Sequence, residues 1–180
     1  MAALLLLLNG CAVWHRVSAR GDSLTNDERL QLAQSYEQQK MFADARRELA
    51  IVLRRDPKNI PALLASGNVS LALGDDAAAE KAFRRTLDLD AANAGAQNNL
   101  AMVYLAEGKL PEAERLARSA AQSGPLRPYA LETLAEIHVK EGKPAQPDWD
   151  AALDAVPPDN PDLRAAIERS RERVEAHTAK

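Results

Sequence analysis

The sequence predicts an all-α fold, a right-handed α-solenoid of about 3.5–4 antiparallel helix pairs closed by a C-terminal capping helix. The main observation is a period of 34 residues, at which small residues recur in three sets: Ala33, Gly67, Ala101 and Ala135; Ala45, Ala79 and Ala113; and Gly74, Gly108 and Gly142. The second observation is that hydrophobic residues make up 46% of the 180 residues and aromatic residues only 4%. Alanine and leucine must therefore form the core, which suits closely packed helices and not a β-sandwich.

The first unit is expected over residues 26–59. Its first helical stretch carries Ala33 and Tyr36, and apolar residues at helical spacing continue into a second stretch. Asp56 stands directly before Pro57. Because a residue before proline is pushed out of the α region, the second helix should end there.

Two further units are expected over residues 60–93 and 94–127. Gly74 and Gly108 occupy the same place in each unit, between two helical stretches. Glycine adopts the left-handed conformation that closes a helix, so each glycine should mark the turn inside its helix pair. Gly67 stands where other units have alanine, which predicts that the paired helices approach most closely at this position.

The fourth unit, over residues 128–159, is degenerate. Its first helical stretch is regular as far as Gly142, but four prolines crowd the second: Pro144, Pro147, Pro157 and Pro158. Proline costs about 3 kcal/mol inside a helix and is tolerated only in the first turn. We therefore expect a short helix over residues 148–155, which Pro147 could begin.

Residues 160–180 are expected to form the capping helix and a short tail. Asn160 and Pro161 suit the cap and the first turn of a helix. The helix carries one narrow apolar stripe, formed by Leu163, Ala166, Ile167 and Val174. Its other residues are charged or small, as a terminal helix needs if one face packs on the last unit and the other faces water.

Local patterns in the units carry a family resemblance. They are Leu32-Ala33-x-x-Tyr36, Leu100-Ala101-x-x-Tyr104 and Ala79-x-x-x-Phe83. Together with the period, they resemble the tetratricopeptide repeat (TPR). The resemblance implies a TPR domain over residues 25–159, in which the first helices of the units line a concave groove. It also implies that a protein or peptide partner binds in this groove.

The candidate groove residues follow from the register of the first helices: Gln34, Glu37, Leu64, Asn68, Leu71, Asn98, Met102, Leu105, Glu132 and Glu136. Asparagine amides can donate to and accept from a peptide backbone, and methionine adapts to varied partners. Asn99 matches a common structural position of the family and is left out. The alternative for the apolar members is packing within the array, in which case Leu71 and Leu105 belong to the core or its edge.

The N-terminal residues suggest an export signal. An apolar run over residues 2–8 has the length of a signal-peptide core, and Leu8-Asn9-Gly10-Cys11 resembles a bacterial lipobox. The resemblance implies a signal peptide over residues 1–10, lipid on Cys11, and a tether over residues 11–24. Ala12 after the cysteine implies an outer-membrane lipoprotein facing the periplasm. The alternative is a cytoplasmic protein with a miscalled leader.

Composition and motifs argue against several other functions. The formal net charge is -3 and basic residues are interspersed with acidic ones, which does not favour nucleic acid. One cysteine cannot complete a cysteine-rich metal site. His138 stands where other units have tyrosine, which predicts a packed residue. The sequence lacks the H-E-x-x-H, G-x-S-x-G and P-loop motifs, so we expect no enzyme, cofactor or metal.

The sequence therefore predicts a protein–protein interaction adaptor. The leader and the repeats together resemble lipoproteins that help to assemble a pilus, a secretion complex or another envelope complex. Two alternatives remain: a non-catalytic accessory subunit of a peptidase or cell-wall hydrolase, and a cytosolic TPR scaffold. The identity of the partner and the oligomeric state do not follow from the sequence.

Overall fold

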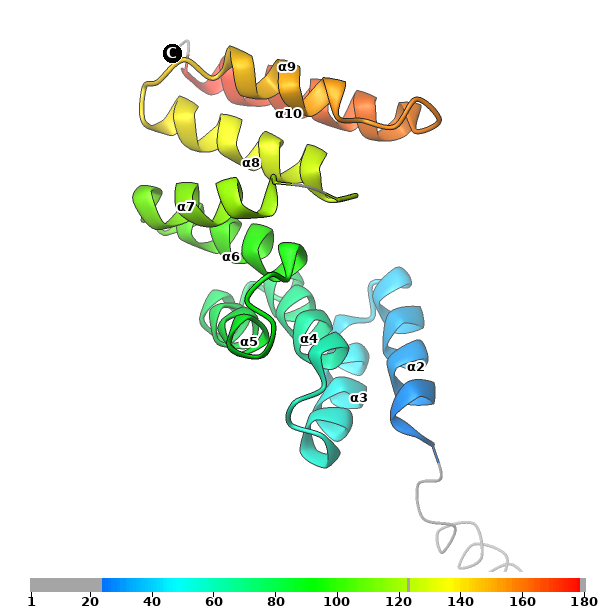
Figure 1. Cartoon of the computed structure of the whole chain (residues 1–180). Coiled ribbons are helices and arrows are strands. Elements are labelled where there is room, and N and C mark those ends of the chain that lie inside the picture. The colour runs from blue at the N-terminus through cyan, green and yellow to red at the C-terminus, as the bar shows by residue number, and fades with distance from the viewer. Residues whose placement is uncertain (1–23, 123, 179–180) are drawn as a thin grey trace, which may run out of the picture.

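The computed structural model of the protein describes residues 24–122 and 124–178, which form helices and turns without strands. With the labels of Figure 1, the helices are α2 (Asn26–Gln38), α3 (Phe42–Arg55), α4 (Ile60–Ala72), α5 (Asp76–Leu89), α6 (Ala94–Ala106), α7 (Leu110–Ala120), α8 (Arg127–Lys140), α9 (Gln146–Asp154) and α10 (Pro161–Thr178). The predicted signal peptide, Cys11 and the predicted tether as far as residue 23 lie outside the described residues. In the described part, no helix has both the length and the apolar character needed to cross a bilayer.

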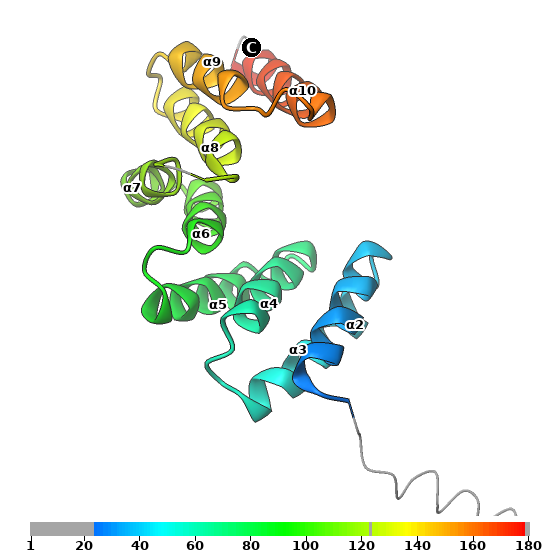
Figure 2. The same cartoon turned by 45° about the vertical axis from the view of Figure 1, so that its right-hand side comes forward.

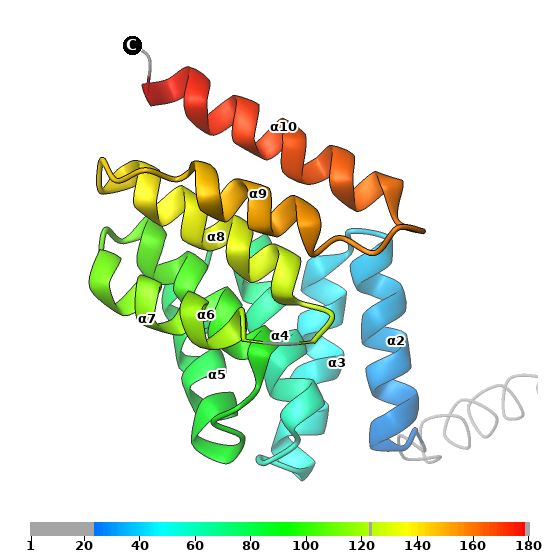
Figure 3. The same ribbon diagram turned by 45° about the horizontal axis from the view of Figure 1, so that its top comes forward.

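The helices pair in chain order and the pairs stack. Helices α2 and α3, α4 and α5, α6 and α7, and α8 and α9 form the closest contacts, and each pair also contacts the next. Figure 2 shows the stack running from the α2–α3 end to the α9–α10 end, and Figure 3 shows α10 beside α9 at the far end. Helix α10 contacts both α8 and α9. The predicted all-α solenoid with a C-terminal helix is confirmed.

The helix beginnings repeat along with the period. Asn59 caps α4 and Asn93 caps α6, and each Oδ1 accepts from the backbone N–H three residues further on, at 3.0 Å. The amide of each asparagine also donates to an aspartate three residues earlier, Asp56 at 3.2 Å and Asp90 at 3.1 Å. A capping side chain satisfies one of the free N–H groups of a helix start and typically contributes about 1 kcal/mol. The 34-residue period therefore extends to the hydrogen bonds between units.

The turns inside the pairs require left-handed backbone. Gly74, Gly108 and Gly142 have φ angles of 74°, 76° and 70°. This conformation brings Cβ too close to the following carbonyl oxygen in every residue except glycine. Lys40 stands at the same place in the first unit and has a φ of 59°. The predicted glycine turns are confirmed, and the first unit forms the same turn with a lysine.

The small residues of the period lie where helices meet. All six alanines of these two sets are buried: Ala33, Ala45, Ala79, Ala101, Ala113 and Ala135. A Cβ added to Gly67 would lie 2.3 Å from Cε1 of Phe83, far inside van der Waals contact. The predicted close approach of α4 and α5 is therefore confirmed.

The last units are held by a core of their own. Trp149 on α9 is buried and packs in a cluster with Ala152 of the same helix and with Leu163 and Ile167 of α10. Helix α9 begins two residues earlier than expected, with Pro147 in its first turn.

Candidate functional site

The first helices of the units, α2, α4, α6 and α8, form a row, because each contacts the first helix of the next unit. Helix α10 extends this row by its contact with α8. Three side-chain hydrogen bonds join neighbouring members at about the repeat distance. They run from Asn99 to Asn68, from Thr133 to Asn98 and from Ser170 to Glu136.

The candidate groove residues divide by exposure. Three are exposed: Gln34, Asn68 and Met102. Six are half-buried: Glu37, Leu64, Leu71, Leu105, Glu132 and Glu136. The last, Asn98, is only 7% exposed. Met102 is 49% exposed, the largest value among the exposed large hydrophobic residues of the described chain.

Two neighbouring asparagines on α6 have roles opposite to those expected. The buried Asn98 accepts from Oγ1 of Thr133 through Oδ1 at 3.1 Å, so its amide joins α6 to α8. Asn99 is half-buried, and its Nδ2 donates to Oδ1 of the exposed Asn68 at 2.7 Å. The accessible amide pair is therefore Asn68 with Asn99, whereas the sequence interpretation paired Asn68 with Asn98. The family resemblance had assigned the structural position to Asn99, and the structure buries Asn98 instead.

The leucines of the candidate strip belong partly to the core. Leu64, Leu71 and Leu105 pack against the central hydrophobic cluster formed by α5, α6, α7 and α8. Each leucine is half-buried, so only part of its side chain is exposed on the row of first helices. Met102 is the apolar member that a partner could reach most fully.

A hollow of about 390 Å³ lies at the C-terminal end of the row, between α6, α8 and α10. It is lined by Leu105, Glu136, Val139, Lys140, Arg173, Val174 and His177. The sequence interpretation named only Leu105 and Glu136 among these. Val139 follows Leu71 and Leu105 at the repeat distance, so the period could have identified it. The contribution of α10 depends on how that helix docks, which no period specifies.

The acidic candidates on α8 face α10. Glu136 accepts from Oγ of Ser170 at 3.1 Å and lies 4.0 Å from the guanidinium of Arg173. Burial raises the pKa of Glu132 above its ordinary value, and the neighbouring carboxylate of Glu136 acts in the same direction. Desolvation disfavours the charged form of a carboxyl group. This part of α8 is therefore partly covered by the capping helix.

A second hollow, of about 550 Å³, lies between α5, α6 and α7. Its wall includes Tyr104, whose hydroxyl accepts from Nη2 of Arg84 at 2.6 Å and donates to Glu80 at 3.1 Å. Lys109 lies 5.0 Å from the centre of the same ring. This arrangement ties the second helix of one unit to the first helix of the next.

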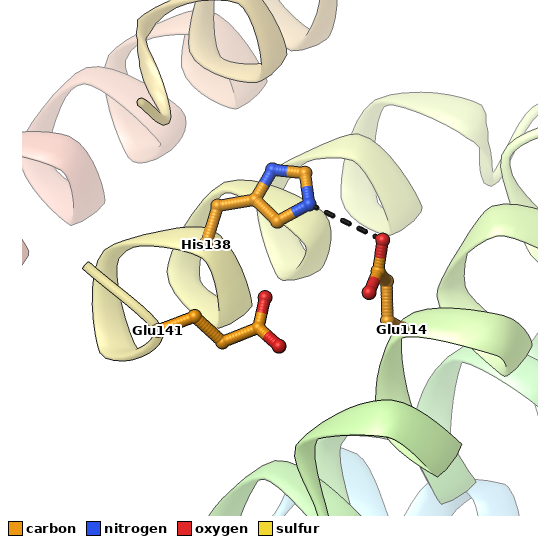
Figure 4. Close-up of side chains that lie close together, drawn as sticks. All are labelled: Glu114, His138 and Glu141. Carbon is orange, nitrogen blue, oxygen red and sulfur yellow. Dashed lines mark hydrogen bonds and ion pairs between the residues drawn. The ribbon is translucent and has the colours of Figure 1, made fainter. Parts of the chain in front are cut away.

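The histidine of the fourth unit takes part in a matching cluster (Figure 4). Nε2 of His138 lies 3.5 Å from Oε1 of Glu114, and Nδ1 lies 2.7 Å from Oδ2 of Asp148. Arg118 pairs with Glu114 at 2.6 Å. Glu114, Arg118 and His138 follow Glu80, Arg84 and Tyr104 at the repeat distance. The predicted place of His138, where other units have tyrosine, is a buried one.

The cluster also holds donor atoms of a kind that binds divalent metals. Glu114, His138 and Glu141 each offer one ligand atom, all within 4.8 Å of one another. Both carboxylates are already paired with Lys143, at 3.6 Å and 2.8 Å. Arg118, followed by His138 and Lys143, holds the pKa of Glu114 below its usual range despite some burial. The arrangement is fully explained as an ion-pair joint between α7, α8 and the turn to α9.

These features define a helical-repeat interaction scaffold, with one row of first helices and a curved stack behind it. The TPR family model matches three overlapping windows, residues 30–96, 64–130 and 98–160, whose starts are 34 residues apart. The chain therefore belongs to the tetratricopeptide repeat family. Proteins with this fold generally mediate protein–protein interactions. Among curated protein sequences, none matches this chain.

Several solved structures share the fold. PilF of Pseudomonas aeruginosa is 24% identical with a TM-score of 0.68, over 84% of this chain and 72% of that one. The type III secretion translocator chaperone SycD of Yersinia enterocolitica is 20% identical with a TM-score of 0.60, over 69% and 92%. YrrB, described as a TPR protein with an unusual peptide-binding site, is 17% identical with a TM-score of 0.66, over 93% and 86%. At these identities the likeness concerns the fold alone.

Proposed function

We propose that the protein is a non-catalytic adaptor that binds a segment of a partner protein along the row of α4, α6 and α8. The observation that carries this proposal is the exposure of Met102, which stands three residues after Asn99 on α6 and so shares a helix face with the amide pair of Asn68 and Asn99. Burial of this half-exposed side chain by a bound partner would be favourable, because it removes apolar surface from water.

The polar and apolar groups at this place suit a polypeptide. One donor and one acceptor of the Asn68–Asn99 pair are used within the pair, and the remaining lone pairs and N–H groups can meet a peptide backbone. Met102 has an unbranched, polarizable side chain that adapts to the shape of an apolar anchor. An extended or helical segment with one apolar anchor therefore fits the site.

We infer further that the adaptor acts in the cell envelope, tethered to the outer membrane through lipid on Cys11 and facing the periplasm. The support for this comes from the Leu8-Asn9-Gly10-Cys11 pattern. A triacylated cysteine would exceed the two membrane signals that stable anchoring requires. An adaptor at this place would act in assembly of a pilus, a secretion complex or another envelope complex.

The groove is tested by crosslinking followed by purification from membranes. Met102→Glu introduces a charge at the proposed contact, and it should remove the partners that the wild-type protein recovers. Leu89→Glu is the matched control, because Leu89 is similarly exposed but lies at the end of α5, a second helix. If the wild-type protein, Met102→Glu and Leu89→Glu recover the same partners in equal amounts, the row of α4, α6 and α8 is not the binding site.

A further inference from the structure

We propose that the hollow between α6, α8 and α10 is a subsite for an apolar side chain flanked by carboxylates on the bound segment. The inference rests on the proposed function, because it names the chemistry of the segment that the row of first helices would bind. The occupant is a stretch of a partner protein in which a large aliphatic or aromatic residue stands next to aspartate or glutamate.

The walls of the hollow are apolar. Leu105 on α6, Val139 on α8 and Val174 on α10 are each half-buried, so each side chain leaves part of its surface uncovered. The volume of about 390 Å³ lies within the range of about 300–1,000 Å³ that holds small ligands. It can accept at least one large side chain, whose burial would contribute about 1.5–3 kcal/mol before the costs of association.

The rim of the hollow is positive. Lys140 and Arg173 are permanent cations at neutral pH, and Glu136 is the one carboxylate among the lining residues. Ser170 and Arg173 already neutralise and hydrogen-bond that carboxylate. The balance of Lys140, Arg173 and Glu136 leaves one net positive charge beside an apolar hollow.

The cations of the rim retain the capacity to bind. Nζ of Lys140 donates to the backbone carbonyl of Leu105 at 2.9 Å, which uses one of the three N–H groups of an ammonium. Nδ1 of His177 donates to the carbonyl oxygen of Arg173 at 2.7 Å, which uses the single N–H of a neutral imidazole, so His177 offers no donor to an occupant. An acidic flank on the occupant would find the two remaining N–H groups of Lys140, and a basic flank would be repelled by the net positive charge of the rim.

The hollow is continuous with the proposed contact surface. Leu105 lies three residues after Met102 on α6, and residues at this spacing lie on one face of a helix. A segment that contacts Met102 therefore reaches the hollow without leaving the row. The charge of the rim then selects among the segments that the apolar surface alone would accept.

Two labelled dodecapeptides test the inference by fluorescence anisotropy. Both carry the same leucine and phenylalanine anchors; one has aspartate and glutamate around them and the other lysine and arginine. We expect the acidic peptide to bind at least about tenfold more tightly, with an affinity that falls as salt rises. Lys140→Glu, a change at an exposed position, should reduce or reverse the preference, and Lys81→Glu on the exposed part of α5 is the matched control.

Each outcome decides between the two proposals. Equal affinities, or binding of neither peptide below about 1 mM, overturn the subsite. If Met102→Glu loses the native partners while Lys140→Glu and Val139→Asp both keep them, the groove function stands and the subsite is wrong. Loss of the native partners in Val139→Asp, with thermal unfolding unchanged, would support both.

Discussion

Lys40 adopts the same left-handed turn in the first unit that Gly74 adopts in the second, with φ angles of 59° and 74°. The two residues are 34 positions apart. The left-handed backbone conformation costs a residue with a Cβ about 1–2 kcal/mol, whereas glycine adopts it without this cost. The period of the fold has therefore imposed a backbone conformation on a residue that does not favour it.

Lys40→Gly should raise the free energy of unfolding by about 0.5–1 kcal/mol. Glycine removes the backbone strain at this turn, and that gain exceeds the extra conformational entropy that a glycine loses on folding. Chemical denaturation measures the difference. Lys40→Ala is the control, since alanine has the same Cβ and should bring no gain. Gly74→Ala should lower stability by a similar amount, and a neutral result there would contradict the explanation.

Gly67→Ala should lower the free energy of unfolding by about 1–3 kcal/mol, because the new methyl group would lie 2.3 Å from the ring of Phe83. Gly95→Ala is the matched control, a helical glycine whose added Cβ would meet its nearest atoms at 3.5 Å. It should raise stability by about 0.5–1 kcal/mol. If thermal unfolding shifts the same way in both variants, the contact with Phe83 does not limit the pair.

Glu132→Gln should stabilise the protein at neutral pH. Burial raises the pKa of Glu132 in the folded state, so the folded protein holds a proton that the unfolded chain has released. Stability therefore falls as pH rises from the ordinary glutamate range through the raised pKa, and the cost persists above it. Unfolding of wild type and variant across this window measures the effect, with Glu168→Gln on the exposed face of α10 as control. A gain that persists unchanged below the ordinary pKa would contradict this origin.

His138→Tyr should be better tolerated than His138→Ala. Tyrosine is what the preceding unit places against the matching Glu–Arg pair, as Tyr104 does against Glu80 and Arg84. Alanine would leave Asp148 without its 2.7 Å partner in a part-buried place, which costs about 1–3 kcal/mol. Thermal unfolding of the two variants ranks them, and the reverse order would mean that the two clusters are not equivalent.

Cys11→Ser should abolish incorporation of labelled palmitate and release the protein from the membrane fraction. The reason is that the thiol is the proposed site of lipid attachment. Labelling of cells that express the wild-type chain is the reference measurement. If the wild-type protein takes up no label, the lipoprotein proposal is wrong, and the cytosolic scaffold becomes the better reading of the leader.

The period made much of the fold predictable. It identified the buried alanines, the contact of Gly67 and the turns at Gly74, Gly108 and Gly142, because each depends on geometry that recurs in every unit. The prolines around α9 predicted a short helix, because proline is disfavoured inside a helix. These features need only the spacing of residues along the chain.

The details of the candidate site depend on how one unit rotates on the next. Asn98 and Asn99 are adjacent, and a turn of about 100° around the helix decides which of them faces α8 and which meets Asn68. The hollow beside Val139 needs the docking of α10, whose stripe predicted a packed face but not its angle. Trp149 was not singled out as a core residue, because a lone aromatic in a short helix has no periodic signal.

The far side of α10 limits what can be added to the array. Its exposed charged residues include Glu168, Arg169 and Glu172. Another helix pair stacking there would have to desolvate these charges, which opposes the gain from its apolar contacts. The charged face of α10 therefore disfavours end-to-end stacking of a second copy at this end of the described array.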